Sequence, residues 1–234
     1  YGAQYLLEGL YENGEADYAL SLMTTNGQRG WLNMLTTGST ITTEAWDSAY
    51  KSNQDWNHAW GAAPANIIPR YALGLRPLEP GFGQVLVQPQ PGPLSYLEGT
   101  VPTIRGPVFI RVDQETNSFK LRLNLPGNVT ATVMLPASGA SQPVALVDGE
   151  VMPGTLTNGW LTIKGISSGH HAIWLSATNR PSQQALYENW RSAWFASDAA
   201  NGSIAGPDAD PDGDGSNNFA EFVFDVYVYR SIWH

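Results

Sequence analysis

The spacing of hydrophobic residues changes once along the sequence, near residue 85, and this change limits the folds that the chain can adopt. Before it, apolar side chains recur three or four residues apart, which is typical of amphipathic helices. After it, apolar and polar residues alternate, as they do in strands with one buried face. The clearest helical run contains Tyr5, Leu6, Leu7, Leu10 and Tyr11, and the clearest alternating run contains Phe119, Leu121, Leu123 and Leu125. We therefore expect helices first and β-structure second.

Several helical segments are expected before residue 84. Two of them flank Gly14, and a third covers residues 30–35 with Gly38 as its C-cap. Residues 58–73 also have helical spacing, but their two prolines must start or kink helical turns. The run of residues 76–83 is rich in Pro and Gly and cannot continue a helix, so we place the first domain border at its end.

Residues 84–178 predict an antiparallel β-sandwich of seven or eight strands. Short apolar runs occur at residues 85–87, 108–112, 119–125, 129–135, 144–147, 160–163 and 171–175, separated by Pro, Gly, Asn and Asp. The pairs Gly127-Asn128 and Asn158-Gly159 are of the kind that closes hairpins. His170 and His171 follow one another in the last run and should lie on opposite faces of a sheet.

Composition excludes several classes of function. The 234 residues carry a net charge of −9, which argues against nucleic-acid binding, since that binding depends on Lys and Arg meeting phosphates. The absence of cysteine excludes disulfides, thiolate zinc sites and a cysteine nucleophile. No apolar run approaches the roughly 18 residues of a membrane span. The first residue is Tyr and no signal peptide follows, so we expect that the natural start has been lost.

A group of polar and aromatic residues between residues 42 and 61 is suited to binding a sugar. Glu44 follows a run of threonines and is expected on a loop, where its carboxylate can act as a general base or hold sugar hydroxyls. Trp46 and Trp56 offer ring faces, and Asn57 and His58 offer hydrogen bonds. Two plainer interpretations stay open: a solvated or capping Glu44, and a histidine at a helix N-terminus that Asn57 caps.

An acidic loop near the end of the chain matches the spacing of an EF-hand calcium loop. The predicted ligands occupy positions 1, 3, 5, 7, 9 and 12 of that pattern and are Asp210, Asp212, Asp214, the Ser216 carbonyl, Asn218 and Glu221. Gly215 stands at position 6, where the loop turns sharply. A disordered acidic linker is the alternative interpretation. The predicted cofactor is calcium, with a structural role.

Three ordered motifs resemble the end of the catalytic domain of bacterial alpha-L-rhamnosidases. Residues 38–47 are similar to the family pattern Gly-Ala-Thr-Thr-x-Trp-Glu-Arg-Trp-Asp, with Thr43 in place of its first Trp and Ala45 in place of its Arg. The pair Asn57-His58 follows, and residues 74–82 are similar to Gly-Ile-x-Pro and Pro-Gly-Phe. Residues 127–136 resemble a strand of the sandwich that follows the catalytic domain in this family. The resemblance covers about residues 1–177, and the acidic tail resembles dockerin-type calcium loops.

The resemblance implies a multidomain α and β chain. Residues 1–83 would be the C-terminal helices of an incomplete (α/α)6 barrel, residues 84–178 an antiparallel β-sandwich, and residues 179–234 an EF-hand or dockerin-like calcium-binding tail. Of these, the sandwich is expected to be a structural support for the barrel.

The resemblance also implies an inverting glycoside hydrolase of a bacterium, secreted or periplasmic, that removes terminal rhamnose from glycosides or polysaccharides. Glu44 would be its general base and would need no cofactor. The general acid would lie in a missing N-terminal part of the barrel, so the fragment alone is expected to be inactive, because inversion requires both groups. The alternative is a non-catalytic carbohydrate-binding or calcium-dependent attachment module.

Overall fold

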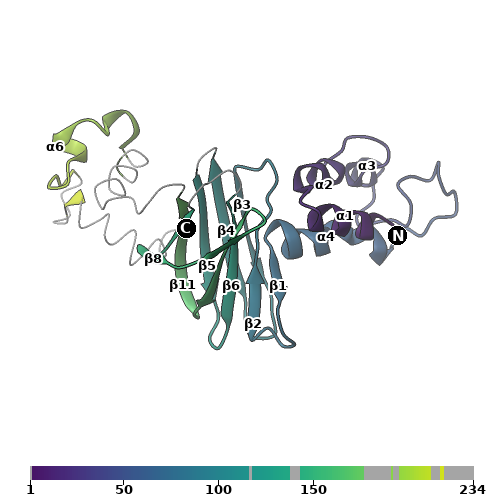
Figure 1. The fold of residues 1–234 in the computed structure, drawn as a ribbon. Coiled ribbons are helices and arrows are strands. Elements are labelled where there is room, and N and C mark those ends of the chain that lie inside the picture. Colours follow the sequence, from purple (N-terminus) through teal and green to yellow (C-terminus); the bar gives the residue numbers. More distant parts are fainter. Residues whose placement is uncertain are drawn as a thin grey trace.

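The computed structural model describes residues 2–115, 118–137, 143–176, 191, 195–211, 217 and 218. Helices of residues 2–73, here called the helical lobe, lie at one side of a central β-sandwich, and a short helical segment lies at the other side (Figure 1). The order of helices first and β-structure second agrees with the expectation from hydrophobic spacing.

The helical lobe begins with a hairpin of two helices, α1 (Gly2–Glu12) and α2 (Ala16–Met23). Gly14 links them with a φ of +81°, a conformation that glycine adopts without strain. Leu7 and Tyr11 are fully buried, whereas Tyr5 and Leu6 of the same apolar run are exposed. The helix therefore packs with only one face, as its period of 3.6 residues requires.

The predicted third helix is present as α3 (Trp31–Thr36), and Gly38 ends it as expected. Gly38 has a φ of +92° and its N–H donates to the carbonyl of Leu35, while the Ser39 N–H donates to the carbonyl of Met34. This pair of bonds is a Schellman motif, which satisfies carbonyls at the helix end. It also turns the chain into the loop that carries Glu44.

The proline-containing segment forms three short helical pieces rather than one helix. These are η1 (Ala59–Ala62), α4 (Ala63–Ile67) and η2 (Ile68–Ala72), the last with π-helical bonding. Pro64 and Pro69 each stand in the first turn of a piece, where the missing N–H of proline costs least. Ile67 and Tyr71 from this segment complete the core of the helical lobe with Leu7 and Tyr11.

The sandwich consists of eleven strands within the described residues, in two sheets. The first sheet has the order β1-β2-β6-β10-β9 and the second has the order β3-β4-β5-β11-β7-β8. The strands are β1 (Leu75–Pro77), β2 (Gln84–Val87), β3 (Tyr96–Val101), β4 (Val108–Glu115), β5 (Ser118–Leu125), β6 (Thr130–Pro136), β7 (Val144–Val147), β8 (Glu150–Met152), β9 (Thr155–Thr157), β10 (Trp160–Ile166) and β11 (Gly169–Ser176). All seven predicted runs are strands.

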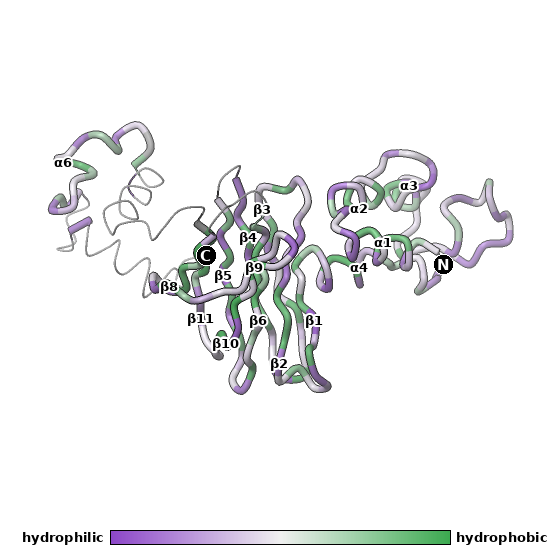
Figure 2. Tube along the Cα trace, in the orientation of Figure 1, coloured by the Kyte–Doolittle hydropathy of each residue, from purple (hydrophilic) through white to green (hydrophobic). Residues whose placement is uncertain are grey.

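The alternating residues of both sheets face inward and form the main core. Buried members include Val87 and Leu135 from the first sheet and Ile110, Leu121 and Ile173 from the second. Figure 2 shows hydrophobic segments concentrated along these strands. Because side chains of a strand alternate between its faces, the polar members of each run point away from the core.

The strand number is eleven among the described residues rather than seven or eight, and three further expectations about the sandwich were wrong. First, β2 and β6 pair in parallel, so the first sheet is mixed rather than antiparallel. Second, the Gly127-Asn128 turn joins β5 and β6, which belong to different sheets, so it closes no hairpin. Third, the sheet begins with β1, inside the Pro- and Gly-rich run that we had assigned to the helical domain. Edge strands as short as β1, β8 and β9 have too few residues to show a period.

The Asn158-Gly159 turn was predicted correctly, since it joins β9 and β10, which pair antiparallel. Both residues have positive φ, 50° and 78°, as a type I′ turn requires.

The segment after the sandwich is described only in part. It contains η3 (Ala196–Asp198) and α6 (Gly202–Ala205), which Asn201 caps by accepting from the Ser203 N–H at 3.1 Å. Most of the predicted calcium tail lies outside the described residues. No helix within the described ranges combines the length and apolar character that crossing a bilayer requires.

His171 joins the last strand to the β7–β8 turn. His170 is exposed and His171 is half-buried, in agreement with their expected placement on opposite faces of the sheet. The Nδ1 atom of His171 lies 2.7 Å from Asp148 Oδ2, and Nε2 lies 2.9 Å from the Ser167 carbonyl. The hydrogen bond that His171 donates to the Asp148 carboxylate raises the pKa of His171 above 6.5, and this effect outweighs the opposing effect of burial.

We therefore predict that the sandwich loses stability as pH rises. The pKa of His171 is higher in the folded than in the unfolded state. Its contribution to the free energy of unfolding is therefore complete below about pH 6.5 and is lost as pH rises past the folded-state pKa. Urea unfolding followed by circular dichroism between about pH 6 and about pH 9 measures this loss. His171→Gln should abolish the loss and His170→Gln should retain it. An equal loss in both variants would contradict the prediction.

Candidate functional site

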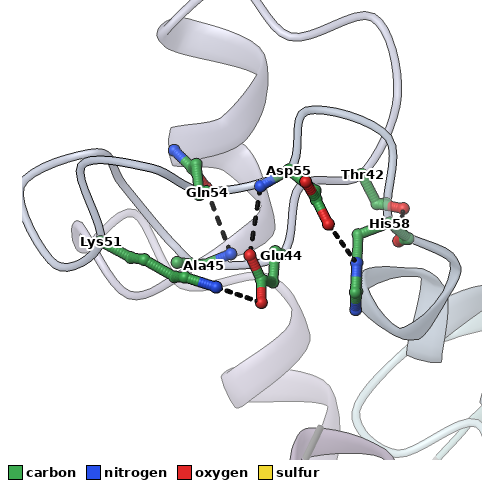
Figure 3. Close-up of polar contacts among 7 residues, drawn as sticks. All are labelled: Thr42, Glu44, Ala45, Lys51, Gln54, Asp55 and His58. Carbon is green, nitrogen blue, oxygen red and sulfur yellow. Dashed lines mark hydrogen bonds and ion pairs between the residues drawn. The ribbon is translucent and has the colours of Figure 1, made fainter.

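The loop of residues 39–58, here called the Glu44 loop, leaves α3 and returns to η1. Its two ends are joined by a pair of hydrogen bonds, in which the His58 N–H donates to the Thr42 carbonyl at 2.8 Å and Thr42 Oγ1 donates to the His58 carbonyl at 2.9 Å. Further in, the Glu44 N–H donates to the Asp55 carbonyl at 3.0 Å, and the Asp55 N–H donates to Glu44 Oε2 at 3.1 Å. Figure 3 shows how Thr42, Glu44, Asp55 and His58 lie in this loop. They give the loop a defined shape.

Buried polar side chains fill the inside of the loop. Gln54 is buried, and its Oε1 atom accepts from the Ala45 N–H at 3.2 Å while Nε2 donates to Ser48 Oγ at 3.0 Å. Thr43 is also buried and donates to the Ala45 carbonyl at 2.7 Å. Because buried polar groups must be paired, these bonds hold the backbone on both sides of Glu44 in one arrangement.

Glu44 lies on this loop, as expected, with both carboxylate oxygens engaged. Oε1 forms an ion pair with Lys51 Nζ, and Oε2 accepts from the Asp55 N–H at 3.1 Å. The hydrogen bond from Lys51 and then the one from Asp55 hold the pKa of Glu44 below 4.5, so the group is ionised near neutral pH. A carboxylate oxygen can accept a second hydrogen bond, so each oxygen can still accept from a water or a hydroxyl.

Sequence reasoning missed Lys51. The available signal was weak: it is a basic residue that follows Glu44 by seven positions in a loop with no predicted shape. Only the folded loop brings its ammonium group to the carboxylate.

The predicted sugar contacts differ in how accessible they are. Trp56 and Asn57 are exposed, and His58 is half-buried with Nδ1 3.8 Å from Asp55 Oδ2. Trp46 instead packs edge-on against Trp31, with ring centroids 4.8 Å apart. Trp60, which was not among the predicted contacts, is exposed and meets the His58 ring at 5.2 Å. Trp56 and Trp60 therefore offer more ring surface to a ligand than Trp46 does.

Two cavities lie away from Glu44. The larger, of about 280 Å³, lies beside Trp60 between α1 and α4. The smaller, of about 150 Å³, lies between α1 and the sandwich. Neither is lined by Glu44, whose side chain is 26% exposed.

The predicted calcium loop is described at only two of its ligands. Asp210 is exposed, and Asn218 is fully buried, with Nδ2 donating to the carbonyls of Ile204 and Gly206 at 2.7 and 2.8 Å. Asp212, Asp214, Ser216 and Glu221 lie outside the described residues. Within the described ranges, no group of three or more His, Asp or Glu side chains is placed to hold a metal.

Taken together, the fold and the loop define a class of protein: a helical segment with an ordered carboxylate loop, followed directly by a β-sandwich. Two family models match this arrangement in order. Residues 1–72 match the bacterial alpha-L-rhamnosidase 6 hairpin glycosidase domain, and residues 74–145 match the bacterial alpha-L-rhamnosidase C-terminal domain. The border between the two matches coincides with Gly74, where the helical lobe meets β1.

Curated relatives agree with these matches. An alpha-L-rhamnosidase of Streptomyces avermitilis is 30% identical over 145 residues, which are 58% of this chain and 14% of that protein. An alpha-L-rhamnosidase of Alteromonas sp. is 26% identical over 149 residues, which are 58% of this chain and 16% of that protein. The chain thus corresponds to a small part of either relative.

Solved structures share the fold. The alpha-L-rhamnosidase of Streptomyces avermitilis complexed with L-rhamnose covers 74% of this chain and 17% of its own, at 26% identity and a TM-score of 0.61. The alpha-L-rhamnosidase from Dictyoglumus thermophilum covers 75% of this chain and 20% of its own, at 21% identity and a TM-score of 0.66, which shows the fold alone. In these comparisons the chain is similar to a part of several alpha-L-rhamnosidases.

The pairing of Glu44 with Lys51 leads to a prediction. Lys51→Gln should raise the pKa of Glu44 toward 4.5. It removes the charged Lys51 donor, whose hydrogen bond lowers this pKa most, and keeps the weaker effect of the Asp55 N–H. A carbon-13 NMR titration of the Glu44 carboxyl group measures the midpoint. Lys164→Gln, on the exposed edge of β10, is the matched control and should leave it unchanged. An unshifted midpoint in Lys51→Gln would show that the ion pair with Lys51 does not lower the pKa of Glu44.

Proposed function

We propose that this chain carries the general base of an inverting alpha-L-rhamnosidase, and that Glu44 is that base. The observation that supports this most strongly is the ordered, ionised carboxylate of Glu44 within the segment that matches the 6 hairpin glycosidase domain. A base must be ionised to take a proton from water, and the contacts of Glu44 keep it so. The same contacts also make Glu44 a weaker base. In this proposal Lys51 therefore moves away from Glu44, or also contacts the substrate, when the substrate binds.

The proposal requires a second carboxyl group from outside the Glu44 loop. An inverting enzyme needs an acid with a raised pKa, about 6.5–9.5 Å from the base, to protonate the leaving oxygen. Asp47 is unsuited, because hydrogen bonds from the Ala49 N–H at 2.8 Å and Asn33 at 3.0 Å lower its pKa. Asp55 is exposed and lies beside His58, so it is not in the buried, apolar site in which enzymes place such an acid. The acid would therefore belong to a further part of the catalytic domain, and the chain alone would not hydrolyse glycosides.

The proposed substrate is a terminal alpha-L-rhamnoside of a glycoside or polysaccharide. The exposed ring of Trp56 would stack on the sugar, with Asn57 and His58 as hydrogen-bonding partners. A surface position for Glu44 fits this proposal, since the remainder of the pocket would come from the same further part that supplies the acid. We extend the proposal to a secreted or periplasmic location. In the rival proposal, a non-catalytic binding module, the same aromatic residues would act without any role for Glu44 as a base.

A hybrid enzyme tests the role of Glu44. Residues 1–145 would replace the aligned segment of the Streptomyces avermitilis alpha-L-rhamnosidase, and rhamnose release from an aryl rhamnoside would be measured. Glu44→Gln should lower kcat by roughly 10²–10⁴-fold, because a general base contributes about that much. Glu15→Gln, at the start of α2 with no capping bond, should leave kcat unchanged.

Two results would count against the proposal. Full kcat in the Glu44→Gln hybrid would favour the binding module, and rhamnose release by the 234-residue chain alone would remove the need for an outside acid.

A calcium-binding tail is a second candidate function, and one observation favours it. The Oδ1 atom of Asn218 is buried and has no partner among the described residues, while Nδ2 is satisfied by two carbonyls. Oδ1 is the atom that position 9 of an EF-hand loop offers to calcium, directly or through a water. An unpaired buried oxygen is costly, and a cation or its water would relieve that cost. We therefore propose that Asp210, Asp212, Asp214, Ser216, Asn218 and Glu221 bind calcium.

Calorimetry tests the calcium proposal. Titrating calcium into the full chain should release heat that Asp212→Ala abolishes, because that change removes a predicted ligand. Asp208→Ala removes an exposed acidic residue outside the pattern and should preserve the heat. No heat from the unsubstituted chain would contradict calcium binding.

A further inference from the structure

The larger of the two cavities lies between α1 and the η1–α4 segment, directly after the Glu44 loop, and is here called the Tyr5–Trp60 cleft. The side chains on which the inference depends are Gln4, Tyr5, Trp60 and Asn66. The volume of about 280 Å³ is far more than the roughly 10–15 Å³ that one water needs. The cleft can therefore hold a ligand the size of a ring.

Two aromatic side chains at this cleft are open to solvent. Trp60 is 58% exposed and Tyr5 is 65% exposed, although they come from segments far apart in the sequence. Exposed apolar side chains that gather at one hollow mark ligand grooves and interaction sites. The rings of Trp and Tyr also suit the C–H faces of sugars. Because both rings are accessible, a ligand in the cleft can reach them.

A network of hydrogen bonds holds the two amides of the cleft in place. Gln4 Nε2 donates to Asn66 Oδ1 at 2.9 Å and to Glu8 Oε1 at 2.7 Å. Arg70 Nη1 donates to Asn66 Oδ1 at 2.8 Å and forms an ion pair with Glu8. The bonds join α1 to the segment that contains α4, so both amides are oriented before any ligand enters.

The network leaves one acceptor and one donor group for a ligand. Among the described hydrogen bonds, none involves the Oε1 atom of Gln4 or the Nδ2 atom of Asn66. Asn66 is exposed and Gln4 is half-buried, so solvent reaches both side chains. An acceptor beside a donor matches a sugar hydroxyl, which can both donate and accept.

The charges near the cleft favour a neutral ligand. Glu8 and Arg70 neutralise each other, and neither lines the cleft. The lining contains no acidic or basic side chain that would attract an ion.

We infer that the Tyr5–Trp60 cleft binds one neutral sugar ring, as a subsite next to the Glu44 loop. The sugar lies against the rings of Trp60 and Tyr5, and its hydroxyls bond to Gln4 and Asn66. The cleft adjoins the loop because the Trp60 ring meets the His58 ring edge-on at 5.2 Å. A substrate with a second sugar beside the rhamnose follows from this position, and that part rests on the proposed function.

Nitrogen-15 NMR of the full chain tests the inference, with D-glucose and L-rhamnose as probes. The indole N–H signal of Trp60 and the side-chain amide signals of Asn66 should shift and saturate with one of them. Tyr5→Ala should weaken this binding by roughly 2- to 10-fold, because it removes one ring contact. An unchanged urea midpoint verifies that the variant folds. Tyr18→Ala, a similarly exposed tyrosine on α2 outside the cleft, is the matched control and should bind normally.

A disaccharide of rhamnose linked to glucose tests the position of the subsite. It should bind more tightly than either monosaccharide, and Trp56→Ala should remove that gain while leaving the glucose shifts unchanged. A disaccharide that binds no more tightly than glucose would show that the cleft is separate from the proposed rhamnoside site.

Three other results would overturn the inference. The first is the absence of any shift of the Trp60 and Asn66 signals with either sugar, which would leave the proposed role of Glu44 untouched. The second is a set of shifts that survives Tyr5→Ala in full but vanishes in Trp56→Ala, which would place the sugar at the Glu44 loop. The third is a change of the same signals on dilution of the protein without sugar, which would make the cleft a contact between two copies of the chain.

Discussion

The close contact between Gly74 and Gln88 determines how the helical lobe sits on the sandwich. Gly74 has a φ of +80°, and a Cβ atom there would lie 2.1 Å from the carbonyl carbon of Gln88. The Gln88 N–H donates to the Gly74 carbonyl at 3.0 Å, and the Gln90 N–H reaches the carbonyls of Tyr71 and Ala72. The end of the last helical turn is thereby bonded to the chain that leaves β2. Only glycine permits both the backbone conformation and the approach.

The junction has consequences on both sides. Leu97 of β3 packs against the core of the helical lobe and the core of the sandwich, so the two cores are in contact through one side chain. Arg76 follows the junction directly and is turned toward Tyr71 and Tyr11, which creates the wall of the smaller cavity. On the other side, the Glu44 loop lies at the side of the helical lobe that faces away from the sandwich (Figure 1). The sandwich thus packs directly against the end of the lobe, and a supporting role for it stays a prediction.

Much of the architecture was accessible from the sequence, because it follows from local patterns. The alternation in residues 119–125 identifies a half-buried strand regardless of what it pairs with, and Gly38 after an apolar helical run identifies a helix end. The parallel pairing of β2 with β6 was not accessible, since it depends on which strand the chain returns to after β3, β4 and β5 have joined the other sheet. Very short strands such as β1 were missed because three residues carry no period. Thr43 and Gln54 look like surface residues in sequence, yet they are buried because they pair within the loop.

The sequence by itself determined the order of helices and sandwich, the positions of most turns, and the presence of a carboxylate among hydroxyl and aromatic residues. These properties depend on residue type and spacing over a few positions, which a linear pattern records. The tertiary structure alone decided that Lys51 pairs with Glu44, that Trp46 packs inward while Trp56 stays exposed, and that Tyr11 and Arg76 meet beside one cavity. Each of these is a contact between groups brought together by folding, and its energy depends on burial and distance that no spacing encodes.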